Sequence, residues 1–238
     1  MVRLIQRPEN SEEILFSFDI EGSHLYIPIP QTSIPQTTAC ESSIPSLAAE
    51  STYDYCLPNW MPAKSIINGT FEYICTADKL RVTPTVFNAR IYRVDDYRPD
   101  PRENLLTIEE TRRVFFGMKV QFKEVLINSN CDKQYFVFPD KENDICNLHT
   151  DSLIWLHTRA GYTAVGPADI SFATPISKNH LLIIDLNTGN FNYGTEEENA
   201  AMRAEAEADL FDFIRSIRIE FSPEIQAQID AARATENA

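Results

Sequence analysis

Strand-like segments follow one another along this chain with few helical segments between them, and this order is what most limits the fold. In residues 14–20, apolar side chains alternate with polar or small ones, the period of two that places one face of a strand in a core. Segments rich in β-branched and aromatic residues follow at 71–77, 80–94, 152–159, 170–175 and 180–186. Strands and helices do not alternate regularly, which argues against a doubly wound parallel sheet. We therefore expect one α+β domain over residues 1–238, with a largely antiparallel sheet.

Three helices are expected beside this sheet. Thr107 and Thr195 each precede a glutamate by three residues, the spacing of a capping box. These caps predict a helix from 108 to about 117 and an amphipathic helix from 196 to about 216. Ser222 before Pro223 starts a third helix, which is poor in large apolar residues and is expected to extend into solvent.

Other local patterns give further expectations. Residues 119–127 and 134–138 resemble strands, residues 181–184 predict a central strand covered on both faces, and Asn68-Gly69 predicts a turn. Pro84 is expected to interrupt the strand in 80–94.

An irregular segment covers residues 28–65. Six of the chain's 14 prolines lie between Pro28 and Pro62, and proline removes a donor that ladders and helices need. Its second half contains the candidate partner-binding residues Tyr53, Asp54, Tyr55 and Trp60. Aromatic residues dominate binding hot spots, and a proline-stiffened loop loses less entropy on binding. The alternative is that Trp60 and one tyrosine pack the loop onto the core.

A second candidate for partner binding is the connection that contains Asp95, Asp96 and Tyr97. Its alternative is an ordinary solvated connection. The adjacent pair Asp95-Asp96 is no catalytic dyad if extended, because neighbouring residues of a strand point to opposite faces.

Charge excludes some partners. The formal net charge is −14, and residues 196–238 hold half of it. Nucleic acids and anionic lipid surfaces require a basic footprint, so we expect neither as a partner. No apolar segment follows Arg3 and Arg7 as in a signal peptide, and no apolar run is long enough to span a bilayer. We therefore expect a soluble, cytoplasmic protein.

No motif for metal, cofactor or catalysis is found in the sequence. The densest set of soft metal ligands is Cys131, Cys146, His149 and His157, yet it lacks a Cys-x-x-Cys pair. Whether these four residues converge in space is left open, as is a Cys146–His157 nucleophile–base pair. Neither a Gly-x-Ser-x-Gly elbow nor a glycine-rich phosphate loop is present. We expect no metal, no cofactor and no enzymatic activity.

One part of the chain resembles a known family. Trp155-Leu156-His157, the segment from Ala173 through Pro175 and Ser177, and the hydrophobic run to Ile184 are similar to a pattern in bacterial immunity proteins. The resemblance covers about 65 residues, including the capped helix after Thr195. It implies a cytoplasmic antitoxin that neutralises a toxin of type VI secretion or contact-dependent systems. It assigns no contact residue.

The expected function is therefore binding of a cognate protein toxin with a basic surface, occluding its active cleft. Two alternatives remain. One is an enzyme of unrecognised type, which needs a pocket with convergent polar groups. The other is a structural or adaptor subunit, which predicts an exposed apolar stripe on Ile225 and Ile229.

Overall fold

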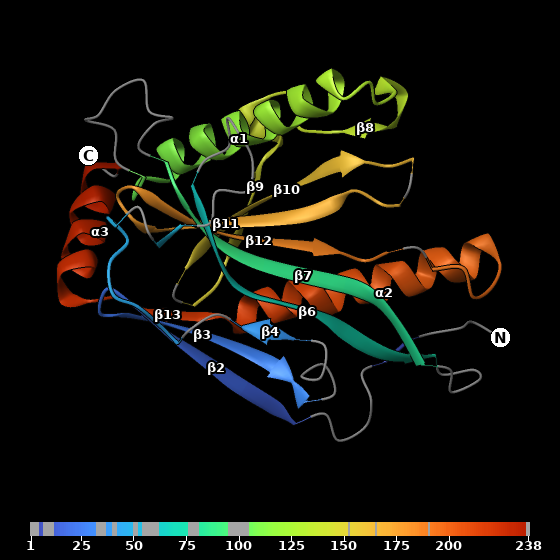
Figure 1. The fold of residues 1–238 in the computed structure, drawn as a ribbon, viewed down its shortest axis with the longest axis horizontal. Coiled ribbons are helices and arrows are strands. Elements are labelled where there is room, and N and C mark those ends of the chain that lie inside the picture. Colours follow the sequence, from blue (N-terminus) through green and yellow to red (C-terminus); the bar gives the residue numbers. More distant parts are fainter. Residues whose placement is uncertain are drawn as a thin grey trace.

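A nine-stranded antiparallel sheet forms the centre of the computed structural model (Figure 1). The structure describes residues 5–6, 12–31, 37–39, 42–49, 52–53, 62–75, 81–94, 105–151, 153–164, 166–189 and 191–236. The main order is β1-β6-β7-β12-β11-β10-β8, while β4 pairs with β6 and β9 with β10. The strands are β1 (Ile5–Gln6), β4 (Thr38–Ala39), β6 (Ala63–Cys75), β7 (Arg81–Arg93), β8 (Phe136–Val137), β9 (Cys146–His149), β10 (Ile154–Tyr162), β11 (Asp169–Ser177) and β12 (His180–Asn187).

A second sheet has the order β13-β3-β2-β5 and contains β2 (Glu13–Ile20), β3 (Ser23–Pro30), β5 (Ser43–Ile44) and β13 (Arg218–Glu220). Its predicted hairpin is confirmed. Glu21 and Gly22 connect β2 and β3 with φ angles of 50° and 80°, the two positive values that a tight hairpin turn needs. The short pairing of β2 with β5 is parallel, and the other pairings among the described residues are antiparallel.

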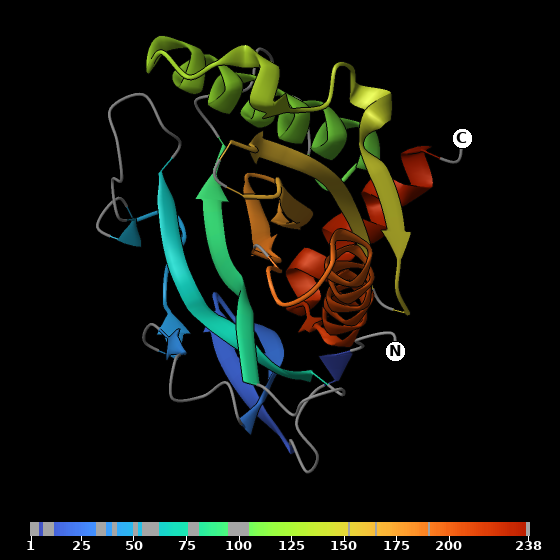
Figure 2. The same cartoon turned by 90° about the vertical axis from the view of Figure 1, so that its right-hand side faces the viewer.

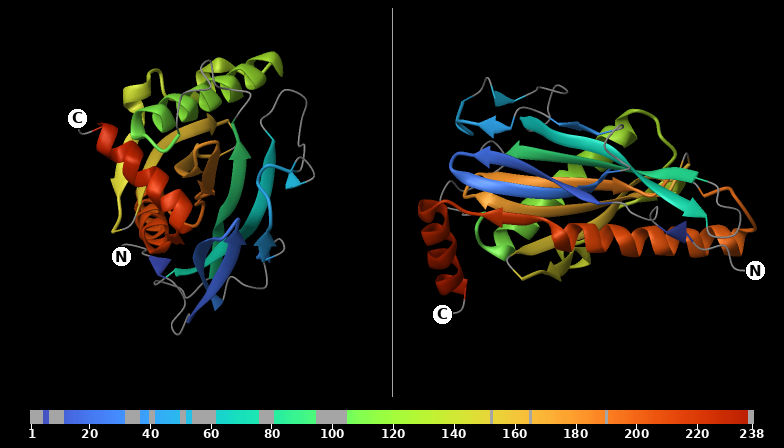
Figure 3. Two further views of the ribbon diagram at one scale, coloured as in Figure 1. Left: turned by 90° about the vertical axis from the view of Figure 1, so that its left-hand side faces the viewer. Right: turned by 90° about the horizontal axis from the view of Figure 1, so that it is seen from below.

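Helices cover both faces of the large sheet. Figure 2, looking along α2 (Glu196–Ser216), shows the sheet curving over that helix, with α1 (Ile108–Asn128) on the opposite face. Figure 3 shows α3 (Pro223–Glu236) at one end of the molecule, crossing the direction of α2. Short 3-10 turns occur at Lys133–Tyr135 and Glu142–Asp144. The α+β class with a largely antiparallel sheet is confirmed.

The core follows from strand β12, which lies between β7 and β11. Leu182 and Ile184 pack toward α2, whereas Leu181 and Ile183 pack toward α1. All four are at most 2% exposed. The prediction of a central strand covered on both faces is confirmed.

Three aromatic rings fasten α2 to the sheet. Phe213 lies with its ring centroid 5.0 Å from that of Phe71 and 5.6 Å from that of Phe87, and the latter two are 5.3 Å apart. The caps at Thr107, Thr195 and Ser222 are confirmed, since each side-chain oxygen accepts a backbone N–H of the first helical turn.

Three local predictions are wrong. Residues 119–127 continue α1 instead of forming a strand, because Val114, Phe115, Met118 and Phe122 keep a helical spacing toward the sheet. The β7 strand continues through Pro84, which falls at a register shift opposite β6.

Asn68-Gly69 lies inside β6 and makes no turn. A Cβ at Gly69 would stand 2.8 Å from the ring of Phe87, so glycine is required there by close packing.

The last helix is partly packed. Most of its side chains are exposed, as its composition predicts, but Ile229 and Ala232 are buried against Leu106. Ile229 is 5% exposed, so the exposed stripe expected of an adaptor subunit is absent at that position.

Replacing the central ring of this packing tests the fold. We expect Phe213→Ala to lower the free energy of unfolding by about 3–5 kcal/mol, because it leaves a cavity between Phe71 and Phe87. Leu15→Ala is the control, at 53% exposure, and should change it by about 0.5 kcal/mol or less. Urea denaturation measures both, and equal effects would contradict this account of the core.

Candidate functional site

Helix α2 is the most acidic helix of the described structure. Its 21 residues contain seven carboxylates and two arginines, a net charge of −5. The helix starts at a reciprocal capping box, in which Thr195 accepts from the Glu198 N–H and the Glu198 carboxylate accepts from the Thr195 N–H. At 1.5 Å per residue it is about 30 Å long.

The two faces of α2 differ sharply. Its inner face is buried through Met202, Ala206, Leu210, Phe213 and Ile214. The opposite side presents a line of exposed residues at a spacing of four, which we call the outer ridge: Glu196, Ala200, Ala204, Ala208 and Asp212.

Carboxylates flank the outer ridge on one side at Glu197, Glu205 and Asp209. The Asp209 carboxylate accepts a hydrogen bond from the Tyr73 hydroxyl at 2.9 Å. Part of the charge on the helix is neutralised locally, since Glu207 pairs with Arg159 at 2.6 Å and Asp212 with Arg215 at 2.7 Å.

This arrangement suits contact with a basic protein surface. The alanine methyl groups along the ridge allow a partner to approach closely, while the flanking carboxylates attract positive charge. Glu196 and Glu197 are both exposed in the first turn, where they also complement the positive end of the helix dipole. Sequence reasoning attributed these glutamates to capping and did not consider the ridge. The sequence signal for the ridge is the line of small or acidic residues that recurs every four positions, on the side of the helix opposite Leu210 and Phe213.

A partly buried polar chain on the other face of the sheet is the closest approach to a catalytic set. The Lys119 Nζ donates to Ser171 Oγ at 2.6 Å, and that hydroxyl donates to Asp185 Oδ1 at 2.5 Å. Lys119 and Asp185 also form an ion pair at 3.6 Å. Ser171 is only 1% exposed, and its hydroxyl is occupied by these two contacts, so the chain fastens α1 to the sheet at the wall of a cavity of about 170 Å³.

Of the candidate residues predicted for partner binding, Tyr53 lies in the described part of the chain. It is 5% exposed, its hydroxyl donates to the Leu47 carbonyl at 2.5 Å, and its ring stacks on His180 with centroids 6.3 Å apart. The Arg93 guanidinium lies 5.2 Å from the ring centroid. Tyr53 therefore holds the loop on the protein, as the alternative interpretation expected.

The other candidates lie outside the described residues, and their role stays a prediction: Asp54, Tyr55, Trp60, Asp95, Asp96 and Tyr97.

The four possible soft ligands do not form one group. Cys146 faces His157 across the β9–β10 ladder, and both line one open surface pocket of about 430 Å³. His149 pairs instead with Ile154, three positions along the same ladder, and Cys131 follows α1. Among the described residues, no three His, Cys, Asp or Glu side chains are placed to hold a metal ion.

Comparison of the chain with known protein families, curated proteins and solved structures finds no match. In the portion of the chain that the structure describes, no helix combines the length and apolar character needed to cross a membrane.

His157 gives a testable pH dependence. Burial, with a smaller contribution from the Arg159 charge, lowers the pKa of His157 below its usual 6.5. The unfolded chain therefore binds a proton more readily than the native protein, so unfolding free energy falls as the pH drops below about 6.5. We expect His157→Gln to reduce that slope.

His149→Gln is the matched control, because His149 is exposed on the neighbouring strand. Urea denaturation at pH 5.5 to 7.5 measures the slopes. A wild-type slope that persists in His157→Gln would contradict the assignment.

Proposed function

We propose that this protein acts by binding a basic protein surface through the outer ridge of α2, and that it serves as a cytoplasmic immunity protein. The carrying observation is the exposed outer ridge, bordered by carboxylates, on a helix of net charge −5 whose other face is locked into the core. A rigid, acidic, convex element is suited to fill a basic cleft, and such a cleft is common in enzymes that act on anionic substrates.

The rigidity of α2 supports this proposal. Five of its residues are buried, and the rings of Phe71 and Phe87 hold Phe213 in place. A preorganised surface loses little conformational entropy on binding, so more of the contact energy appears as affinity.

The residues that carry the resemblance to immunity proteins have a role in the fold and do not form a partner-binding surface. Trp155 is fully buried, and Thr174 is 2% exposed. These residues build the sheet and offer nothing to a partner, which agrees with the absence of any contact residue in the resemblance.

The enzyme alternative has less support from the geometry. In its best polar set the Ser171 hydroxyl accepts from Lys119 and donates to Asp185, so the hydroxyl is already engaged in structural contacts. The adaptor alternative requires Ile229 to be exposed for a partner, but this residue is buried within the chain.

Charge reversal on the ridge tests the proposal. The protein would be mixed with the product of an adjacent toxin gene, and binding measured by surface plasmon resonance. We expect Glu196→Lys combined with Glu197→Lys to slow association about tenfold or more at low salt, with a smaller effect at high salt. Ala204→Gln should weaken binding without changing charge, because it adds bulk to the ridge.

The matched control reverses two exposed carboxylates on the α1 side, Glu124→Lys with Asp140→Lys. Rescue of cells that express the toxin is measured in parallel. If the wild-type protein neither binds the toxin nor rescues growth, the immunity role is wrong. If wild type binds but both double variants behave alike, the ridge is not the contact surface.

A further inference from the structure

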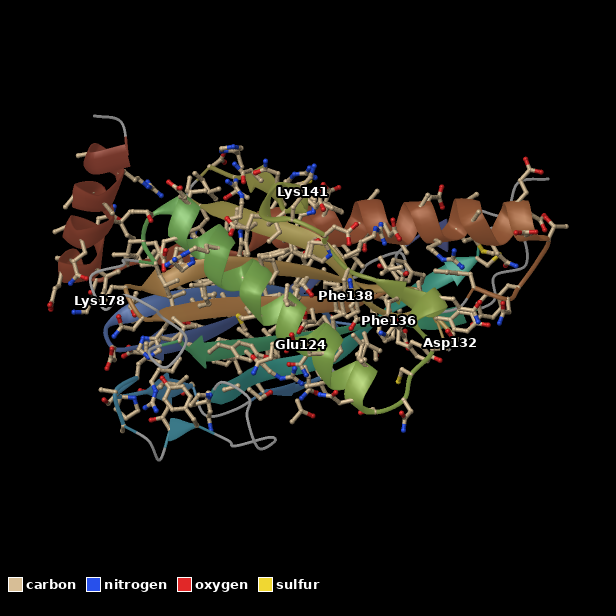
Figure 4. All side chains as sticks on the ribbon, turned by 90° about the horizontal axis from the view of Figure 1, so that it is seen from above. Glu124, Asp132, Phe136, Phe138, Lys141 and Lys178 are labelled. Carbon is tan, nitrogen blue, oxygen red and sulfur yellow. The ribbon has the colours of Figure 1, made fainter. Side chains whose placement is uncertain are left out.

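Two cavities meet under the C-terminal half of α1. The first, of about 170 Å³, lies between α1 and the sheet, and the second, of about 220 Å³, lies beside it. Phe122 from α1 and Asp169 from β11 line both. Figure 4 shows α1 crossing the sheet over this region, with Phe136 and Phe138 beside the helix.

Asp169 is held in a fixed orientation. Its Oδ1 accepts a hydrogen bond from the Asn187 side-chain N–H at 2.5 Å, while Asn187 Oδ1 accepts from the Gly189 N–H at 2.6 Å. Because a backbone donor occupies the amide oxygen, the amide nitrogen must face the carboxylate. Gly189 has a φ of 61°, a conformation that favours glycine. The Asn187 amide and the Gly189 N–H that orient Asp169 are both neutral groups.

The charges around the two cavities are unequal. The first cavity is lined by two basic side chains, Arg90 and Lys119, and Lys119 lies 3.6 Å from Asp185 as its ion-pair partner. Of the described residues that line the second cavity, Asp169 is the one with a charged side chain. Among the described residues, no basic group lies within 4.0 Å of Asp169 as an ion-pair partner.

Two aromatic rings form part of the walls beside Asp169. Phe122 lines both cavities and Tyr162 lines the second. A chain of ring contacts connects them, with centroid distances of 5.7 Å for Phe122–Phe138, 5.9 Å for Phe138–Phe136 and 5.9 Å for Phe136–Tyr162. The walls are therefore supported by their neighbours, and aromatic faces attract cations.

Burial raises the pKa of Asp169 above its ordinary value. The Asn187 hydrogen bond opposes this rise, the nearby Asp185 charge adds to it, and Lys119 opposes it. The ionised carboxylate is thus disfavoured relative to water, and a bound cation would restore its stability.

We propose that the second cavity binds the ammonium group of a small organic amine, held by the Asp169 carboxylate against the rings of Phe122 and Tyr162. The apolar part of the ligand extends into the first cavity along Tyr92 and Met118. A carboxylate with aromatic walls is the combination that recognises organic cations in water, because the ion pair and the ring faces act on the same charge. This site is separate from the outer ridge of α2 and does not depend on the proposed immunity role.

Three probes of matched size test the proposal on the full chain by calorimetry and amide chemical-shift mapping in an amine-free buffer. These are 2-phenylethylamine, 2-phenylethanol and phenylacetate, which carry a cationic, a neutral and an anionic group. We expect the amine to bind about tenfold or more tightly than either analogue. Its shifts should centre on Phe122, Tyr162 and Gly166.

Asp169→Asn should weaken amine binding about tenfold or more and leave binding of the alcohol unchanged. The control Asp140→Asn makes the same charge change at a side chain that is 90% exposed and should leave amine binding unchanged. Asp169→Asn should also raise the melting temperature at neutral pH, since the charge of a half-buried carboxylate is removed.

Equal binding of amine and alcohol, a preference for phenylacetate, or amine shifts away from these residues would each overturn the proposal on the wild-type protein alone. Unchanged amine binding in Asp169→Asn would overturn the role of that carboxylate.

Discussion

Strand β12 must be covered on both faces, and the rest of the fold depends on this constraint. Leu181 and Ile183 face one side of the sheet while Leu182 and Ile184 face the other. Exposing four such side chains would cost several kcal/mol of transfer free energy, at about 25 cal/mol per Å². One helix must therefore lie on each face, and the inner faces of α1 and α2 meet this need. The outer face of α2 is thereby left exposed to solvent.

The sequence predicts the elements of this fold better than their extent. A period-two pattern predicts the first strand of the β2–β3 hairpin, apolar and β-branched composition predicts strands β10 to β12, and the threonine caps predict the starts of α1 and α2. The sequence predicts a strand in the second half of α1, because the inner side of the helix is partly polar there and the helical apolar pattern is weak. Lys119 faces Ser171 and Asp185 there, and such a contact depends on residues more than 50 positions away.

The candidate sites were less predictable for the same reason. The outer ridge lies on one helix, so the sequence alone shows its spacing of four. Whether the alanines at 200, 204 and 208 face solvent depends on what the opposite face of the helix contacts. The cavities under α1 are assembled from α1, β10, β11 and β12, and no local pattern joins Phe122 with Asp169. Among the predicted loop residues, Tyr53 is buried by its contacts with Leu47 and His180 within the protein, and these contacts are not visible in the local sequence.

The contrast between two aspartates on neighbouring strands argues that the cavity at Asp169 has a purpose beyond folding. Both face α1, where Lys119 and Phe122 lie three residues apart on one side of the helix. Lys119 reaches Asp185 and completes an ion pair, whereas Phe122 brings an aromatic ring to Asp169. If the helix needed only to be fastened to the sheet, a second basic residue at position 122 would satisfy the second carboxylate as well. A ring in its place leaves a half-buried carboxylate in a cavity lined by an aromatic side chain, which costs stability and creates an environment that a cation would complete.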